Sequence, residues 1–331
     1  MRFVPYHQLD GRPNVIVDGS PTDGTVLTVT HWPGYPPPEM VAADTSGEMA
    51  FRLLEHPELF SGAKLVSNNH FDQDGLVSIH ALVAPEAACP RRAFLEDVAR
   101  AGDFATYRHR DAARVSMVLS AWATGRGGLD LPAVYDEAAG LLYQHWALRL
   151  GELCADVAAH RALWAAEDET LTASEAAVAG DVTIEERPEQ DLAVVDVPIG
   201  APAAGGHRFG GDWAVGLHPM AVHNATERIV LATVRGRTYD VEQRYESWVQ
   251  LRSRPLRLRR DLAPLAARLH DEERGDATWT ATPVSGLVPR LRSGKGDSSI
   301  PRHRFVDLLV DHLATAPPAW DPFSTTPGSL P

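Results

Sequence analysis

The segment 67-SNNHFDQDGLVSIHAL-82 decides how the first half of this chain is interpreted. An apolar run, 63-AKLVS-67, precedes it and is typical of a buried strand. The residues that close the segment are largely apolar and predict a helix. Between strand and helix, His70, Asp72 and Asp74 stand at alternate positions. An imidazole and two carboxylates are therefore expected together where a strand gives way to a helix.

Side chains at alternate positions share one face at the end of a strand. In open α/β sheets, ligands bind at the carboxyl ends of the strands. This residue set suits a divalent cation such as Mn²⁺ or Mg²⁺, and a bound cation would relieve the repulsion between Asp72 and Asp74. A polar loop is the alternative, in which one aspartate only caps the helix that follows and His70 faces solvent.

Composition limits the class of protein. The 331 residues are 44% hydrophobic, which is enough for two domains with separate cores. No apolar run approaches the roughly 18 to 20 residues of a membrane helix, and the N-terminus lacks the features of a signal peptide, so a cytoplasmic protein that does not enter membranes is expected. The formal net charge of -13 argues against binding to long duplex nucleic acid.

The first part of the chain alternates strand-like and helix-like patterns. Apolar runs at 14-NVIVD-18, 25-TVLTVTH-31 and 63-AKLVS-67 read as strands, and Thr45 with Glu48 has the spacing of a capping box at a helix start. This alternation predicts an α/β fold with a mostly parallel sheet and flanking helices.

The rest of the chain divides at about residue 180. Helical patterns that we interpret as packing run from about 91 to 180, and strand-like runs return at 182–198. The predicted domains are an α/β domain with a helical extension over 1–180, an α+β substrate-binding domain over 181–315, and a Pro/Ser-rich extended or disordered tail over 316–331.

The run HFDQDGLVS resembles the first motif of the DHH phosphoesterase superfamily, a strand that ends in HxDxDxxxS. The superfamily includes RecJ-type nucleases, nanoRNases, cyclic dinucleotide phosphodiesterases and family II inorganic pyrophosphatases. Further motifs have counterparts upstream. The segment 14-NVIVDGSP-21 resembles the second-strand motif and offers Asp18, while 43-ADTSGEMAFRLL-54 resembles the helix that opens with SSTAE. In 26-VLTVTHWPG-34, the residues that replace Asp-His-His are Thr30, His31 and Trp32.

The order of these motifs differs from that of the family, in which the HxDxD motif comes first. A circular permutation would explain the order, because a metal site in a sheet depends on where the strands lie in space. The segment 98-VARAGDFATY-107 supplies a further acidic position, Asp103. The resemblance implies one or two Mn²⁺ or Mg²⁺ ions and catalytic roles for Asp72, Asp74 and His31. The metal ligands that it implies are Asp18, His31, His70, Asp72, Asp74 and Asp103.

The C-terminal part resembles the substrate domain of the family in two places. The segment 248-WVQLRSR-254 resembles a strand that ends in a phosphate-binding arginine, here Arg252, and a helix-like run follows at 261–269. The glycine-histidine loop of the family is missing after that helix. A GGH run occurs earlier, at 205-GGHRFGGDW-213, and offers His207 as a second substrate-binding residue.

The resemblance implies a hydrolase that uses metal-activated water on phosphate esters or anhydrides. Its substrate would be a small nucleotide, a short oligonucleotide or a pyrophosphate-like molecule. Because the full Asp-His-His triplet is absent, a catalytically degenerate protein that binds a nucleotide or phosphate is the alternative. A metal-dependent hydrolase of a nonphosphate substrate also stays open, since folds host many chemistries. The sequence is also compatible with a homodimer.

Overall fold

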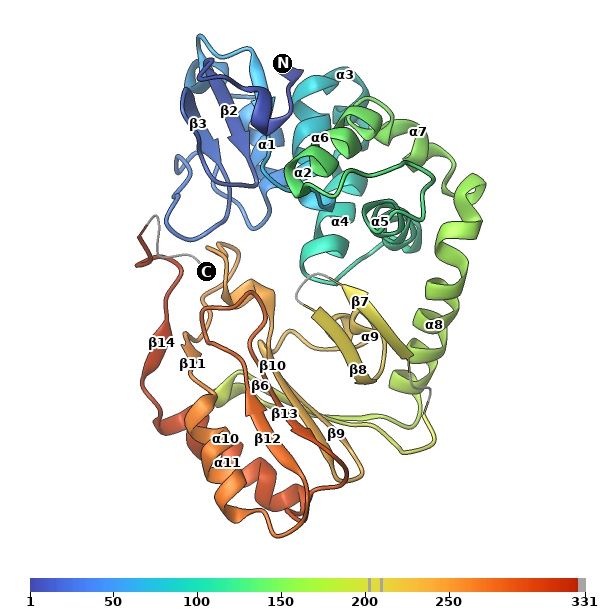
Figure 1. The fold of residues 1–331 in the computed structure, drawn as a ribbon, viewed down its shortest axis with the longest axis vertical. Coiled ribbons are helices and arrows are strands. Elements are labelled where there is room, and N and C mark those ends of the chain that lie inside the picture. Colours follow the sequence, from blue (N-terminus) through green and yellow to red (C-terminus); the bar gives the residue numbers. More distant parts are fainter. Residues whose placement is uncertain (202–203, 209–210, 327–331) are drawn as a thin grey trace. The chain divides into compact units, whose positions relative to one another are not determined.

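A computed structural model describes residues 1–201, 204–208 and 211–326, with side chains described outside 202–215. The chain forms two compact units (Figure 1). The first comprises Met1–Asp168 and Gln250–Ser253, and the second comprises Glu169–Val249 and Arg254–Pro331. The division falls inside a long helix, whereas the sequence places a boundary near residue 180, where that helix ends.

The first unit contains a four-stranded parallel sheet in the order β1-β4-β2-β3. Every residue of β2 and β4 is buried, as expected for strands covered on both faces. The predicted mixed α/β architecture with a largely parallel sheet is confirmed for this unit. The strands are β1 (Arg2–Phe3), β2 (Asn14–Val17), β3 (Thr25–Val29) and β4 (Leu65–Ser67).

Helix α1 contacts this sheet, and so does α2, which is the central helix of the unit. All its residues from Gln73 to Leu82 are buried, and it packs between α1 and α4. The predicted start of α1 is correct, because Thr45 Oγ1 accepts a hydrogen bond from Glu48 N at 3.2 Å. The helices are α1 (Ser46–Leu53), α2 (Gln73–Val83), α3 (Pro85–Ala88), α4 (Arg92–Asp103), α5 (Arg110–Ala123), α6 (Tyr135–Trp146), α7 (Leu150–Ala155) and α8 (Arg161–Ala179).

The second unit is built on a six-stranded sheet in the order β12-β13-β10-β9-β6-β5. Only the β6–β9 pair is parallel among these strands. Helices α10 (Ala263–Glu272) and α11 (Arg302–Thr315) share one hydrophobic core with the sheet. The strands are β5 (Thr183–Arg187), β6 (Leu192–Asp196), β9 (Val230–Arg235), β10 (Thr238–Gln243), β12 (Thr278–Ala281) and β13 (Arg290–Gly294).

Smaller elements complete the second unit. Strands β7 (Ala204–Arg208) and β8 (Gly211–Gly216) pair in antiparallel orientation, and α9 (Pro219–Ala225) follows β8. Part of the predicted tail is ordered, since β14 (Pro318–Trp320) pairs with β11 (Arg259–Arg260). Within the described ranges, no helix is both long and apolar enough to cross a membrane.

The strand implied by 248-WVQLRSR-254 is wrong. Strand β10 ends at Gln243, and a short 3-10 helix and turn follow it. Trp248 is buried in that turn and stacks on Tyr245, so its apolar character reflects packing and not a sheet position. The next residues form a loop, in which Gln250 N donates to the carbonyl of His31 at 2.8 Å.

Candidate metal centre

Asp18 lies directly after β2 and is 1% exposed. Its backbone is in the left-handed region with φ of 48°, a conformation that aspartate tolerates better than most residues. Oδ1 accepts a hydrogen bond from Ser46 Oγ at 2.9 Å. Oδ2 is buried and has no hydrogen-bond partner among the described residues. Burial and the carboxylates of Asp72, Asp74 and Asp103 raise the pKa of Asp18 well above its usual value.

His31 follows β3 and is fully buried. Its Nδ1 donates to the backbone carbonyl of Asp44 at 2.7 Å, because a carbonyl can only accept. Burial lowers the pKa of His31 to about 4, so the neutral ring carries its lone pair on Nε2. That nitrogen lies 3.6 Å from Asp18 Oδ1 and 3.4 Å from Asp103 Oδ2. The lone pairs of these three atoms repel one another, and a cation between them would replace this repulsion with attraction.

His70 and Asp72 lie where the sequence predicts them, between β4 and α2. His70 Nε2 is 2.9 Å from Asp72 Oδ2 and 3.5 Å from Asp18 Oδ2. Asp72 caps α2, since its Oδ1 accepts from Gly75 N at 2.8 Å. His70 is buried at 8% exposure, so the alternative of a solvent-facing histidine is wrong. One oxygen of Asp72 therefore serves the helix while the other faces His70 and Asp18.

Asp74 is held by the N-terminus of α1. Its Oδ2 accepts from Ser46 N at 2.7 Å, and its Oδ1 accepts from Gly47 N at 2.6 Å. These amides and the helix dipole favour a carboxylate there. Burial and the neighbouring Asp72 nevertheless raise the pKa of Asp74 to about 7.

All six residues proposed from the sequence as metal ligands come together. Among the described residues, potential ligand atoms gather in two groups, within which they lie within 4.8 Å of one another. Asp18 is common to both groups, so its carboxylate could hold an ion together with either group. The first group is Asp18, His31, Asp74 and Asp103, and the second is Asp18, His70 and Asp72.

Asp44 orients this centre from outside. Besides the contact of its carbonyl with His31, its Oδ1 accepts from the backbone amides of Arg252 and Ser253, each at 2.8 Å. Its Oδ2 accepts from Arg100 at 3.1 Å. An imidazole whose second nitrogen is fixed by a backbone carbonyl is the usual arrangement for a metal-binding histidine.

The structure describes the two expected substrate-binding residues, Arg252 and His207, to different extents. Arg252 lies in the loop Gln250–Ser253 of the first unit, and its guanidinium is 3.5 Å from Glu39. The side chain of His207, on β7, lies outside the described residues.

Two polar side chains beside the centre, those of Tyr143 and Asn68, were not predicted as site residues from the sequence. Tyr143 belongs to a helical segment whose leucine-rich spacing indicates packing, and Asn68 belongs to the polar run before His70. Both side chains are buried next to Gly75. The adjacency of Asn68 to the HxDxD motif was a usable signal for it, whereas Tyr143 had none.

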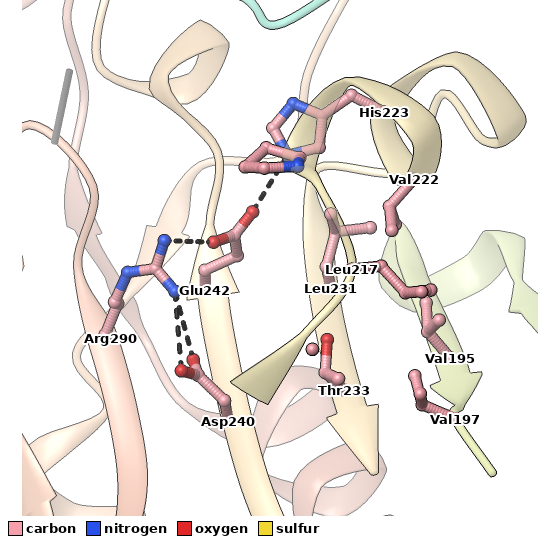
Figure 2. Close-up of a pocket in the computed structure, with 12 residues that line it drawn as sticks. Val195, Val197, Leu217, Val222, His223, Leu231, Thr233, Asp240, Glu242 and Arg290 are labelled. Atoms are coloured by element: carbon pink, nitrogen blue, oxygen red, sulfur yellow. Dashed lines mark hydrogen bonds and ion pairs between the residues drawn. The ribbon is translucent and has the colours of Figure 1, made fainter. Parts of the chain in front are cut away.

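The second unit holds a different polar cluster, around a cavity of about 50 Å³. Strands β10 and β13 place Glu242 opposite Arg290 and Asp240 opposite Arg292. Figure 2 shows the guanidinium of Arg290 between the two carboxylates, with His223 on the far side of Glu242 at 3.0 Å. Because two carboxylates already match its charge, Arg290 is poorly suited to bind a phosphate here.

Comparison with known proteins gives a family but no activity. Searches among curated proteins and among solved structures found no match. One family matches residues 1–324, and it is described as a family of unknown function, DUF6687. The match extends over both units, and this chain belongs to the DUF6687 family.

Proposed function

We propose that this protein is a metal-dependent hydrolase of phosphate esters or anhydrides. The observation that carries the proposal is the pair of ligand groups that share Asp18. Three carboxylates with one imidazole, and two carboxylates with one imidazole, suit a hard or borderline cation, which favours Mn²⁺ or Mg²⁺. Two such ions would activate a water molecule and neutralise charge on a phosphoryl group.

The protein contributes rigid placement of the ligands. Asp44 fixes the ring of His31, the amides of α1 hold Asp74, and the first turn of α2 holds Asp72. The side chains of His70 and Asp72 are 10% and 12% exposed, whereas those of Asp18, His31 and Asp103 are at most 3% exposed. A substrate would therefore approach from the side of His70 and Asp72.

Strand order supports membership of the DHH phosphoesterase superfamily in a circularly permuted form. The parallel strands β2, β3 and β4 are neighbours in one sheet, so their carboxyl ends meet at one edge. Asp18 precedes His70 in the chain and still lies 3.5 Å from it, and His31 shares a ligand group with Asp18. The substrate class that fits this centre is a small phosphorylated molecule such as a nucleotide, a short oligonucleotide or pyrophosphate.

One observation favours a binding protein without turnover as the second candidate. Thr30 and Trp32 replace two residues of the family triplet. The hydroxyl of Thr30 accepts from Trp32 N at 3.2 Å, and the ring of Trp32 lies 5.1 Å from that of His70. Neither side chain supplies the carboxylate or imidazole that the triplet would provide.

The test compares Mn²⁺ and Mg²⁺ binding with turnover of bis-nitrophenyl phosphate, pyrophosphate and short dinucleotides. Asp72→Asn keeps the oxygen that caps α2 but removes the charge, so it should abolish turnover in a folded protein. Asp156→Asn is the matched control, because Asp156 caps a short 3-10 helix through Ala159 N at 3.2 Å. A wild-type protein that takes up neither metal would refute the proposal, and metal uptake without turnover would favour the binding protein.

A further inference from the structure

Within the described part of the chain, two buried donors beside the proposed metal centre lack acceptors. Asn68 Nδ2 and the hydroxyl of Tyr143 have no hydrogen-bond partner among the described residues. Both approach Gly75 so closely that an added Cβ would collide with them. The orientation of Asn68 is fixed, because its Oδ1 accepts from His70 N at 3.0 Å. A buried donor is expected to have a partner, so these two indicate a missing interaction.

An acceptor lies close to this point, the carboxylate of Asp72. Its Oδ1 lies 3.1 Å from the position that a Cβ at Gly75 would occupy, on the same side as the two donors. Its Oδ2 faces His70 at 2.9 Å and so belongs to the second ligand group. The two oxygens of Asp72 therefore have different neighbours. The ligand group lies beside Oδ2, whereas Oδ1 accepts from Gly75 N at 2.8 Å and has the two donors near it.

The position of Tyr143 is set by its ring. The ring packs against Phe3 at 5.2 Å between centroids and edge-on against Phe71 at 5.0 Å. Because Tyr143 lies on α6, its hydroxyl extends from the helical extension to the first turn of α2. The ring contacts account for its packing, but they do not explain a hydroxyl at this place.

We propose that Tyr143 and Asn68 are positioning residues for Asp72: Gly75 N keeps its bond to Oδ1, and the Tyr143 hydroxyl, with Asn68 Nδ2 beside it, donates to the remaining lone pair of Oδ1 when Oδ2 holds an ion. This inference rests on the metal centre of the proposed function. Carboxylates that bind a metal through one oxygen are commonly hydrogen-bonded through surrounding groups, and loss of such a partner typically costs about 10- to 100-fold in metal affinity. Glycine at position 75 leaves both donors room to reach this carboxylate.

Tyr143→Phe tests the proposal, because it removes the hydroxyl and keeps the ring. In a Mn²⁺ titration followed by calorimetry and by electron paramagnetic resonance, we expect two ions per wild-type chain. In the variant, one affinity should fall by about 10- to 100-fold and the other should stay unchanged. The metal-free variant should melt at the wild-type temperature or above it, since the hydroxyl that it loses has no partner among the residues that the structure describes.

Tyr239→Phe is the matched control. The hydroxyl of Tyr239 is also buried but donates to the carbonyl of Ile300 at 2.7 Å. This control should therefore lower the melting temperature of the metal-free protein and leave both Mn²⁺ affinities unchanged. The two variants thus separate a positioning role from a packing role.

Three results would overturn the proposal. Unchanged Mn²⁺ affinities in Tyr143→Phe would show that the hydroxyl does not support Asp72. A melting temperature lowered as in Tyr239→Phe would assign Tyr143 to packing. A wild-type protein that binds no metal would overturn the proposed function together with this inference, whereas the first two results leave the proposed function standing.

Discussion

The two units each bury a cluster of acidic residues and histidine, and the clusters differ in what faces the carboxylates. In the second unit, Asp240 and Glu242 face the guanidinium groups of Arg290 and Arg292. In the first unit, the hydrogen bonds described for Asp18 and Asp74 come from a hydroxyl and backbone amides. In the second unit, arginine compensates the carboxylates within the protein. The cluster of the first unit instead gains most from a cation supplied from outside.

The largest effect should come from removing the shared ligand of the first unit. Asp18→Asn keeps an oxygen for Ser46 but removes the charge that both groups use. Both Mn²⁺ affinities should fall by more than about 100-fold, since this change removes a direct ligand and not merely an outer partner. The metal-free variant should be at least as stable as the wild type in urea, because repulsion with neighbouring carboxylates is relieved. Retention of either tight site would contradict the bridging role.

Breaking the cluster of the second unit should lower stability and leave metal binding unchanged. Arg290→Met leaves two buried carboxylates without their shared partner, which should lower the free energy of unfolding by about 3 to 5 kcal/mol. Metal stoichiometry should not change. Arg268→Met is the control, since its pair with Asp311 is 46% exposed on the arginine side and should contribute at most about 1 kcal/mol. Urea unfolding of both variants checks the difference, and equal losses would refute it.

The two clusters should also respond to pH with opposite signs. The pKa of Asp74 is raised to about 7 by burial and Asp72, so the metal-free protein retains a proton that the unfolded chain releases near pH 4. The contribution of this protonated carboxyl to the stability of the folded protein is present at low pH and is lost as pH rises to about 7. Burial would raise the pKa of Glu242, but Arg290 and His223 hold it at about 2. Its contribution is present above about pH 4.3 and is lost as pH falls toward 2.

Unfolding of chelator-treated variants measures this contrast. The free energy of unfolding of Asp74→Asn, minus that of the wild type, should increase as pH rises from about 4 to 7. The increase should be at most about 1.4 kcal/mol per pH unit. For Glu242→Gln, the loss relative to wild type should be greatest above about pH 4.3 and should shrink as pH falls toward 2. Parallel pH profiles for the two variants would remove the distinction between the clusters.

The smallest effect should come from one neutral donor of the first unit. Ser46→Ala removes the hydroxyl that donates to Asp18 but keeps the amide that binds Asp74. We expect a loss of about 1 kcal/mol in the metal-free protein and two ions still bound per chain. Calorimetric titration and urea unfolding of the same sample check both values. A loss as large as that of Arg290→Met would place the two clusters in the same class.

The architecture of the first unit could be predicted because it rests on local signals. Apolar runs mark β2, β3 and β4, and Thr45 marks the start of α1. The convergence of Asp18, His31 and His70 could be anticipated despite their order in the chain, since the carboxyl ends of neighbouring parallel strands meet at one edge.

Other features depend on tertiary contacts that sequence patterns do not encode. The place of Tyr143 is set by how α6 packs on Phe3 and Phe71. The segment around Trp248 resembles a strand motif, but it forms a turn in which Trp248 stacks on Tyr245. The sequence does indicate the charged residues of the second unit's cluster, because charges alternate in 239-YDVEQ-243 and 290-RLRSG-294. Their pairing required the antiparallel register of β10 and β13.

The most direct test is anomalous diffraction from crystals grown with Mn²⁺. We expect two peaks about 4 Å apart in the first unit, each with its ligand atoms at roughly 2.0 to 2.6 Å. One ion should contact His31, Asp74 and Asp103, the other should contact His70 and Asp72, and Asp18 should bridge them. The absence of peaks at this centre, or peaks only in the cavity of the second unit, would contradict the account.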